Sequence, residues 1–458
     1  MSKRKRKKTV PPPEQPPIAQ GAPSTLSEPG ARRVLGALLV VYVVVGLAAA
    51  VVVPHDASTS EPRLTPPDES AHWLYVKELA TERRLPVFYK GVGNYEAHQP
   101  PLYYLTVLWT YLLAGDAGIL WARLWSLLVS SATLLVVWHM SSLLVGQSLW
   151  MRLATVGALA FVPGRLMTMA CVSNDPMFEL WAALSLWLSL RAAKLGVSLR
   201  QVALLGVCLG LLLLTKTSGI ALAPVVGLAL VIEPSWRREG LKRLVIHGLV
   251  IAAVVACLWG WWVARNMMLY GEPLALETFQ RIFKVDRPGP DFFLSRGLTY
   301  SGYWMLVAWQ TWMSVWGVFG QATVYMPPLF YAIGNALGVA AGGGLVLGAL
   351  RRYAGGAEGE PAKKGIDRGW IIAVLLLVLT LVTFMRFNTV FYQAQARYFL
   401  GSSPILAAVL ALGFAGLSRR RGHPAVVMIP AMLLAFMSVW AVVAYAGGGY
   451  SFVPPSLQ

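Results

Sequence analysis

The sequence predicts an all-α polytopic membrane protein with about eleven transmembrane helices and with interfacial helices in its first outer loop. Of its 458 residues, 56% are hydrophobic and 13% are charged, about half the charged share of a soluble domain. The apolar residues form runs of about 20, the length that a helix needs to cross a bilayer. Lys and Arg gather in alternate connections, which is typical of the cytoplasmic face.

The N-terminal residues 1–33 are predicted to be a disordered, basic cytoplasmic tail. They begin with the basic run Ser2–Lys8 and continue through a Pro-rich stretch that has too little apolar surface to fold. The basic run is expected to fix the orientation of the chain, and binding to anionic headgroups is the alternative. The apolar run 34–53 is too long for the core of a signal peptide, so it is predicted to be the first transmembrane helix.

Ten further apolar runs complete a predicted transmembrane domain over residues 34–446. They lie at 119–144, 152–171, 175–193, 201–215, 217–232, 244–264, 327–350, 369–386, 399–417 and 425–446. The shorter run 101–114 follows two prolines and ends at Gly115, so we expect an interfacial or re-entrant helix there. The loops 54–118 and 265–326 and the short tail 447–458 then lie outside. The chain is predicted to sit in the plasma membrane with a cytoplasmic N-terminus.

The long outer loop 265–326 carries four tryptophans at near-helical spacing: Trp304, Trp309, Trp312 and Trp316. This pattern predicts an amphipathic helix in the headgroup region, where tryptophan gathers. An aromatic platform for a sugar or a lipid is the alternative.

The formal charge of +18 is compatible with nucleic-acid binding, but the position of the charges excludes that class. The excess of Lys and Arg lies in the tail and in the predicted cytoplasmic connections, where membrane topology accounts for it. No nucleic-acid partner is expected. The cysteines Cys171, Cys208 and Cys257 lie in or beside apolar runs, without the spacing of a disulfide framework or of a zinc site.

Acidic and imidazole groups cluster in the first outer loop. Asp68, Glu69 and His72 follow Pro66-Pro67 on a predicted surface helix that reaches about Arg84, at a spacing that lets their side chains meet. Asp68 could also serve only as the helix cap, with Glu69 complementing the helix dipole. His98 and Gln99 follow in the same loop and are candidate substrate contacts, as is His72.

A third acid, Asp175, lies where a predicted span meets the same face of the membrane. It belongs to Ser173-Asn174-Asp175-Pro176, so a helix cap is again the alternative. Several acids, two histidines and an amide at one membrane face favour chemistry over capping. Asp68, Glu69 and Asp175 are therefore the candidate catalytic residues.

Three cationic side chains are candidate binding groups at the same face. Lys216 interrupts two apolar runs, and an ammonium at the bilayer centre would cost about 3 kcal/mol, so it is expected to face water or an anion. Arg397 and Arg265 occupy similar positions, and a guanidinium can hold phosphate oxygens bidentately. Snorkelling toward the headgroups is the alternative. Tyr398, beside Arg397, is included among the candidate contacts.

These groups together define a reaction class. A carboxylate can act as the general base that activates an acceptor, while fixed cations stabilise the charge that develops on a departing phosphate. No nucleotide sugar is expected outside the cytoplasm, so the activated donor would be carried by a lipid. Glycosyl transfer from a polyprenyl phosphate fits these conditions.

The residues resemble the GT-C superfamily of integral membrane glycosyltransferases, in the branch of the protein O-mannosyltransferases and the lipid A aminoarabinose transferases. The resemblance covers roughly residues 34–417 and rests on Asp68-Glu69, His98-Gln99-Pro100-Pro101-Leu102-Tyr103-Tyr104, Ala122-Arg123-Leu124, Asp175, Leu214-Thr215-Lys216-Thr217-Ser218-Gly219 and Arg397-Tyr398-Phe399.

The resemblance implies an inverting transfer in which Asp68 deprotonates the acceptor hydroxyl while Lys216 and Arg397 hold the lipid phosphate. Some members of the superfamily use a divalent metal ion and others do not. Glu69, His98 and Asp175 are candidate ligands, and the metal question stays open at this point.

The predicted function is transfer of a hexosyl or pentosyl group from a polyprenyl-phosphate donor to an extracytoplasmic glycan, lipid or protein. The alternative is a transporter or flippase of polyprenyl-linked glycans, which should carry charged groups at mid-span along a path. A non-catalytic scaffold is a third hypothesis.

Overall fold

The computed structural model describes residues 26–55, 64–89, 94–234, 236–283, 288–355, 367–418 and 423–454. Most of the predicted basic tail, residues 1–25, lies outside the described residues. Helix α1 (Glu28–Val52) begins earlier than the predicted span at 34, because Ser27 caps it and accepts a hydrogen bond from the Gly30 amide. Pro29 suits the first turn, where its missing N–H costs nothing.

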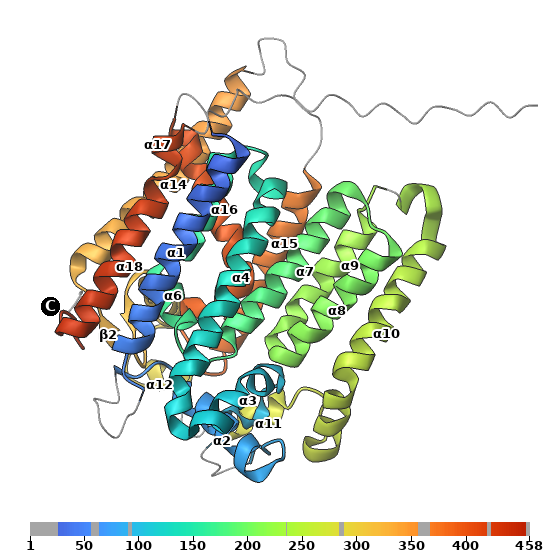
Figure 1. Cartoon of the computed structure of the whole chain (residues 1–458), viewed down its shortest axis with the longest axis vertical. Coiled ribbons are helices and arrows are strands. Elements are labelled where there is room, and N and C mark those ends of the chain that lie inside the picture. The colour runs from blue at the N-terminus through green and yellow to red at the C-terminus, as the bar shows by residue number, and fades with distance from the viewer. Residues whose placement is uncertain are drawn as a thin grey trace, which may run out of the picture.

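The fold class is confirmed: an all-α bundle forms the membrane domain (Figure 1). Its larger helices are α1, α4 (Ile119–Val145), α7 (Asp175–Leu195), α8 (Leu199–Thr215), α10 (Trp236–Tyr270), α14 (Pro328–Gly355), α15 (Arg368–Asn388), α16 (Ser403–Leu417) and α18 (Ile429–Gly447). Shorter ones are α5 (Leu149–Ala160), α6 (Pro163–Met169), α9 (Ala223–Val231) and α17 (Pro424–Val427).

Seven helical stretches in the described residues are long and apolar enough to cross a membrane. Three shorter apolar stretches, at 149–160, 199–215 and 217–231, and helix α7 occupy the remaining predicted positions. One predicted span, 152–171, is not continuous. The chain breaks at Phe161-Val162 between α5 and α6, because Pro163 cannot continue a helical hydrogen-bond ladder and disfavours helical backbone at the residue before it.

The elements of the two loops predicted to lie outside gather at one end of the bundle, where Figure 1 shows α2 (Glu69–Glu82), α3 (Leu102–Ala114) and α11 (Leu276–Phe283) together. Short 3-10 turns join or extend the helices there: η2 (Tyr95–His98), η3 (Gly115–Gly118), η4 (Thr217–Leu222) and η6 (Ala396–Ser402). Helix α3 is separated from α4 at Gly115, whose φ of 57° is left-handed and suits glycine. The predicted short helix at 101–114 is therefore a distinct element.

The second outer loop contributes α12 (Pro290–Leu294), α13 (Tyr300–Trp316) and a hairpin of β1 (Val318–Phe319) and β2 (Val324–Tyr325). The four predicted tryptophans lie on α13. The C-terminal segment joins the hairpin, because Tyr325 and Ser451 exchange backbone hydrogen bonds of 2.8 and 2.9 Å. Gln321, at the hairpin turn, donates to the Pro66 carbonyl at 3.2 Å and so supports the segment before α2.

Helices α14 and α16 approach closely through glycines. A Cβ atom at Gly344 would lie 1.8 Å from the carbonyl oxygen of Gly413, and one at Gly416 would lie 1.9 Å from the carbonyl oxygen of Gly344. Small residues of this kind let helix backbones meet inside a bilayer, where van der Waals packing drives helix association.

Substituting Gly344→Ala is expected to destabilise the protein by about 1–3 kcal/mol, because the added methyl group forces α14 and α16 apart. Gly343→Ala is the matched control, since nothing lies within 4 Å of its Cβ position and the gain in helix propensity is the same. Thermal unfolding in detergent measures the difference. Equal midpoints for the two variants would contradict the close contact.

Candidate active site

The outer-loop helix α2 is fastened to the bundle by a buried ion pair. Arg123, on α4, donates to Glu69 through Nε at 2.8 Å and through Nη2 at 2.5 Å. Arg123 Nη1 also donates to the carbonyls of Ala50 and Val53 at the end of α1. Glu69 Oε1 accepts the Val172 amide at 2.7 Å. One side-chain pair thus joins α1, α2, α4 and the segment that leads into α7.

Glu69 was predicted to be catalytic, and the structure places it away from open space. Both Glu69 and Arg123 are 1% exposed. The hydrogen bonds from Arg123 and Val172 occupy both carboxylate oxygens of Glu69. A carboxylate in this setting holds the loop in position, and it is not available to take a proton from an acceptor.

Asp68 has a different environment from its neighbour. Its φ of 65° is left-handed, which is uncommon for a residue other than glycine and recurs at functional sites. Its side chain makes no capping hydrogen bond to α2, so the alternative of a simple helix cap does not describe it. Instead Oδ1 accepts the Tyr95 hydroxyl at 2.9 Å, and Oδ2 forms an ion pair with Arg397.

Asp175 completes a row of alternating charges. It is the first residue of α7 and is 1% exposed. Lys216, at the break between α8 and η4, donates to Asp175 Oδ1 at 2.5 Å, and Nη1 of Arg397 lies 4.0 Å from Asp175 Oδ2. Asp68, Arg397, Asp175 and Lys216 were singled out from distant parts of the sequence, and the structure brings all four together.

The charges in this row set the protonation of the loop carboxylates and imidazoles. Burial alone would raise the pKa of Asp68, but Arg397, His72 and the hydrogen bonds outweigh it and hold that pKa well below its ordinary value. Burial lowers the pKa of His72 to about 3 and that of His98 to about 4, so both imidazoles are neutral at pH 7. Asp68 is the ionised group.

The two histidines contact residues next to the row of charges. His72 Nδ1 shares a hydrogen bond of 2.8 Å with the Tyr104 hydroxyl. His98 Nδ1 donates to the Tyr95 carbonyl at 2.8 Å, and its ring lies 4.1 Å from that of Phe279, centroid to centroid. These contacts fix the turn that carries Tyr95, the partner of Asp68.

The remaining candidates are Gln99, Tyr398 and Arg265. Gln99 Nε2 donates to His98 Nε2 at 3.1 Å, and Gln99 Oε1 accepts from Asn174 at 3.4 Å. The Tyr398 hydroxyl donates to Gln393 at 3.0 Å. Arg265 is not brought to the row: it donates to the Pro86 carbonyl at 2.6 Å and lies over the Trp262 ring. It holds the segment after α2 against α10.

Sequence reasoning missed several residues of the site. Tyr95 and Glu96 shortly precede the motif His98–Tyr104, but neither was assigned a role, and Arg123 was noted only as part of a motif. Glu96 is 8% exposed, and burial and the negative charges of Asp68 and Asp175 raise its pKa to about 8 against the opposing Lys216 and Arg397.

A cavity of about 560 Å³ opens from the row of charges into the bundle. Arg397 and Asp175 supply charged groups at its wall, and Trp312 and Trp316 of α13 line it together with Leu, Val and Ala side chains of α5 and α16. Two of the four tryptophans that the sequence analysis singled out thus line a cavity. The wall is mostly apolar, with Arg165 and neutral polar side chains such as Thr311, Ser314 and Gln395 beside the charged groups.

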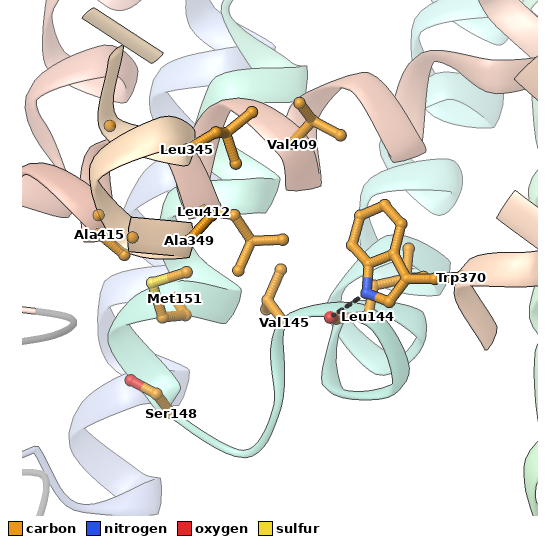
Figure 2. A pocket seen from close by; sticks show the side chains of 13 residues that line it. Leu144, Val145, Ser148, Met151, Leu345, Ala349, Trp370, Val409, Leu412 and Ala415 are labelled. Atoms are coloured by element: carbon orange, nitrogen blue, oxygen red, sulfur yellow. Dashed lines mark hydrogen bonds between the residues drawn. The ribbon is translucent and has the colours of Figure 1, made fainter. Parts of the chain in front are cut away.

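A second cavity, of about 680 Å³, lies between α14, α15, α16 and the turn from α4 to α5 (Figure 2). Its wall includes Leu144, Met151, Leu345, Trp370 and Leu412, and no charged residue of the described chain lines it. The Trp370 indole donates to the Leu144 carbonyl at 3.3 Å. None of the candidate site residues reaches this cavity.

The candidate metal ligands do not form a site. Within the described residues, no three His, Cys, Asp or Glu side chains are placed to hold a metal ion together. Glu69 is paired with Arg123, Asp175 is paired with Lys216, and His98 Nδ1 is engaged by a backbone carbonyl. Carboxylates that are already neutralised by cations do not suit a divalent ion, so no step of the chemistry is derived through one.

Comparison with known proteins bears on this architecture. A family model described as dolichyl-phosphate-mannose-protein mannosyltransferase matches residues 98–262, which include Asp175 and Lys216. The structure is similar to ArnT from Cupriavidus metallidurans bound to undecaprenyl phosphate, with 15% identity, 92% of this chain and 70% of that chain covered, and a TM-score of 0.53.

The chain has the GT-C fold, as its sequence predicted. It is also similar to the Archaeoglobus fulgidus oligosaccharyltransferase AglB in complex with an inhibitory peptide and a dolichol-phosphate, with 13% identity, 92% and 56% coverage and a TM-score of 0.51. The same enzyme in complex with Zn and sulfate gives 13% identity, 90% and 52% coverage and a TM-score of 0.50. The chain spans about half the length of this archaeal enzyme. No curated protein sequence matches it.

Substituting Glu69→Gln is expected to destabilise the protein by about 3–5 kcal/mol, because it leaves the buried Arg123 guanidinium without its counter-charge. Glu82→Gln is the matched control, since Glu82 pairs with Arg84 at the surface. Thermal unfolding in detergent compares them. A Glu69→Gln variant as stable as Glu82→Gln would show that the pair does not hold the loop.

Substituting Glu96→Gln is expected to stabilise the protein increasingly as the pH rises from 5 to 9. The raised pKa of Glu96 means that the folded state binds its proton more tightly than the unfolded state, so stability is lost between its ordinary pKa, about 4.3, and about 8. Glutamine removes that loss. The unfolding midpoints of both proteins across this range measure the effect, and a pH-independent difference would refute the assignment.

Proposed function

We propose that this protein is a glycosyltransferase that moves a sugar from a polyprenyl-phosphate donor to an acceptor on the extracytoplasmic side of the plasma membrane. The observation that carries the proposal is the row Asp68, Arg397, Asp175 and Lys216, because two of its members, Arg397 and Asp175, line a mostly apolar cavity. A lipid phosphate combines an anion with a long apolar chain, and the row and cavity offer a matching surface for each part.

Lys216 and Arg397 are assigned to the phosphate of the donor. Two fixed cations at one point stabilise the charge that the phosphate acquires as the sugar leaves. The guanidinium of Arg397 also presents a planar fork that suits phosphate oxygens. The assignment is supported by the similar structures, which are complexes with undecaprenyl phosphate and with dolichol-phosphate.

Asp68 is assigned the role of general base. Arg397 forms an ion pair with Asp68 in the structure and keeps its carboxylate weakly basic. A phosphate that draws Arg397 away removes this pairing, and the basicity of Asp68 then rises. The base would therefore become effective only when the donor is bound.

The bond changes follow from these assignments. Asp68 takes the proton of the acceptor hydroxyl, and the acceptor oxygen forms a bond to the anomeric carbon of the sugar. The bond from that carbon to the phosphate oxygen breaks, and its electron pair stays with the polyprenyl phosphate. Attack opposite the leaving phosphate inverts the anomeric centre. Asp175, bonded to Lys216, orients the ammonium that faces the phosphate.

The transporter alternative draws on one observation, a charged pair inside the bundle. Arg165 on α6 donates to Glu179 on α7 at 2.8 and 2.6 Å, and Ser403 donates to the same carboxylate at 2.6 Å. A path for a polar cargo needs groups that can exchange partners. This pair is locked by three hydrogen bonds, which favours a structural role.

The test follows the loss of labelled sugar from a panel of polyprenyl-phosphate monosaccharides, with the full-length protein in lipid and a native membrane extract as the acceptor source. The wild type is expected to consume one donor. Asp68→Asn is expected to be slower by at least about 10²-fold because the base is lost. Donor binding is expected to be retained or tightened, because the phosphate no longer competes with Asp68 for Arg397. The exposed Asp116→Asn is the matched control.

Each result discriminates between the hypotheses. Equal consumption by the wild type and Asp68→Asn would remove Asp68 as the base. Binding of a donor by the wild type without any consumption would favour the transporter.

A further inference from the structure

The side chain of Glu96 is buried without a partner. It is 8% exposed, and its Oε2 atom accepts no hydrogen bond. A buried polar atom left unpaired costs about 1–3 kcal/mol, so native proteins keep few of them. The charge row and the apolar cavity do not explain why an acid stands here.

The backbone around Glu96 is held firmly. Its amide donates to the Asn94 side chain at 3.2 Å, and its carbonyl accepts the Gln99 amide at 2.8 Å. Asn94 in turn donates to Glu78 of α2 at 3.2 Å. These bonds fix the turn η2 on the outer-loop helix, so the position of the Glu96 side chain is set by its scaffold and not by a partner of its own.

Glu96 shares the electrostatic environment of the charge row. Its carboxyl interacts with the charges of Asp68, Lys216, Arg397 and Asp175, and its neighbour Tyr95 is the hydrogen-bond donor to Asp68. Glu96 therefore lies within electrostatic reach of all four charges of the row, and its buried Oε2 atom is free to accept a hydrogen bond.

A second free acceptor lies on the segment before α7. Asn174 is 1% exposed, and its Oδ1 atom has no hydrogen-bond partner. Its Nδ2 group lies 3.4 Å from both Gln99 Oε1 and the Thr215 carbonyl, and these donations orient the amide. Glu96 and Asn174 are joined through Gln99, so the two free acceptor atoms belong to one hydrogen-bonded unit.

The chemistry of these atoms selects the ligand. The raised pKa of Glu96 leaves its carboxyl group mostly protonated and neutral at pH 7, so it can both accept and donate a hydrogen bond. A phosphate would gain nothing from the acceptor oxygen of the Asn174 amide, and a metal cation would be repelled by Lys216 and Arg397 nearby. Sugar hydroxyl groups are neutral and can donate to either atom. A site built with unpaired acceptors discriminates strongly against a ligand that cannot fill them.

We propose that Glu96 Oε2 and Asn174 Oδ1 bind hydroxyl groups of the transferred sugar and so form the sugar subsite of the active site. The proposal rests on the proposed function. It names residues that bind the sugar of the donor, whereas Lys216 and Arg397 are assigned to its phosphate. In this arrangement the cations hold the phosphate, the cavity holds the prenyl chain, and the unit of Glu96 and Asn174 holds the sugar ring.

The experiment measures the binding of two classes of lipid to the full-length protein in lipid nanodiscs. One is bare undecaprenyl phosphate, and the other is a panel of undecaprenyl phosphates that carry one hexose or pentose, with mannose included. The ratio of the two dissociation constants reports the contribution of the sugar. Wild type, Glu96→Ala, Glu96→Gln and Asn174→Ala are compared, with Glu82→Ala as the exposed control.

The wild type is expected to bind at least one sugar-bearing lipid more tightly than the bare lipid. Glu96→Ala should reduce that preference about tenfold, because it removes a hydrogen bond to the sugar, while its affinity for the bare lipid stays unchanged. Retained binding of the bare lipid also shows that the variant is folded. Glu96→Gln keeps an acceptor oxygen and should restore part of the preference, and Asn174→Ala should lower it.

Three results would overturn the proposal: a wild type without preference for any sugar-bearing lipid, an unchanged preference in Glu96→Ala, or an equal loss of affinity for both lipids. Sugar transfer is followed on the same samples. A sugar preference that depends on Glu96, without transfer, would contradict the proposed glycosyltransferase and leave the sugar subsite standing. Sugar transfer together with a preference that does not depend on Glu96 would contradict the sugar subsite and leave the proposed glycosyltransferase standing.

Discussion

The ion pair between Glu69 and Arg123 is the contact on which the candidate site depends. Asp68 lies one residue before Glu69, and Val172, whose amide also binds Glu69, lies shortly before Asp175. The pair therefore sets the positions of two acids that are more than a hundred residues apart in the sequence. Burying two charges is costly, but here the guanidinium and the carboxylate each have several partners. A hydrophobic contact would hold the loop with less directional control.

The four charges of the row balance one another, and this constrains how a donor can bind. Two carboxylates and two cations leave little net charge, so an added phosphate must compete with Asp68 and Asp175 for the same cations. In the proposed reaction this competition links binding of the donor phosphate to activation of the base. The phosphate takes Arg397, and Asp68 is released to act as a base. The left-handed backbone at Asp68 is a further sign of a position held by its surroundings.

Much of the fold could be predicted from the sequence, because the length of an apolar run directly indicates a membrane helix. It did not show the break before Pro163, since the apolar run continues through it. Asp175, Lys216 and Arg397 could be selected because charged groups at the ends of apolar runs are costly and therefore informative. Asp68 could be selected because acidic and imidazole groups cluster around it. The sequence could not distinguish the role of Glu69 from that of Asp68, because only the fold shows that Glu69 is paired with Arg123. Glu96 escaped notice because an acid in an outer loop looks like a solvated residue until its burial is known.

The most direct test of the account is a structure of the protein with undecaprenyl phosphate bound. The account predicts that the phosphate lies within hydrogen-bond distance of Lys216 and Arg397, that Arg397 has left Asp68, and that the prenyl chain occupies the cavity lined by Trp312 and Trp316. A phosphate bound elsewhere, for instance at the cavity beside Trp370, with the pair of Arg397 and Asp68 intact, would contradict it.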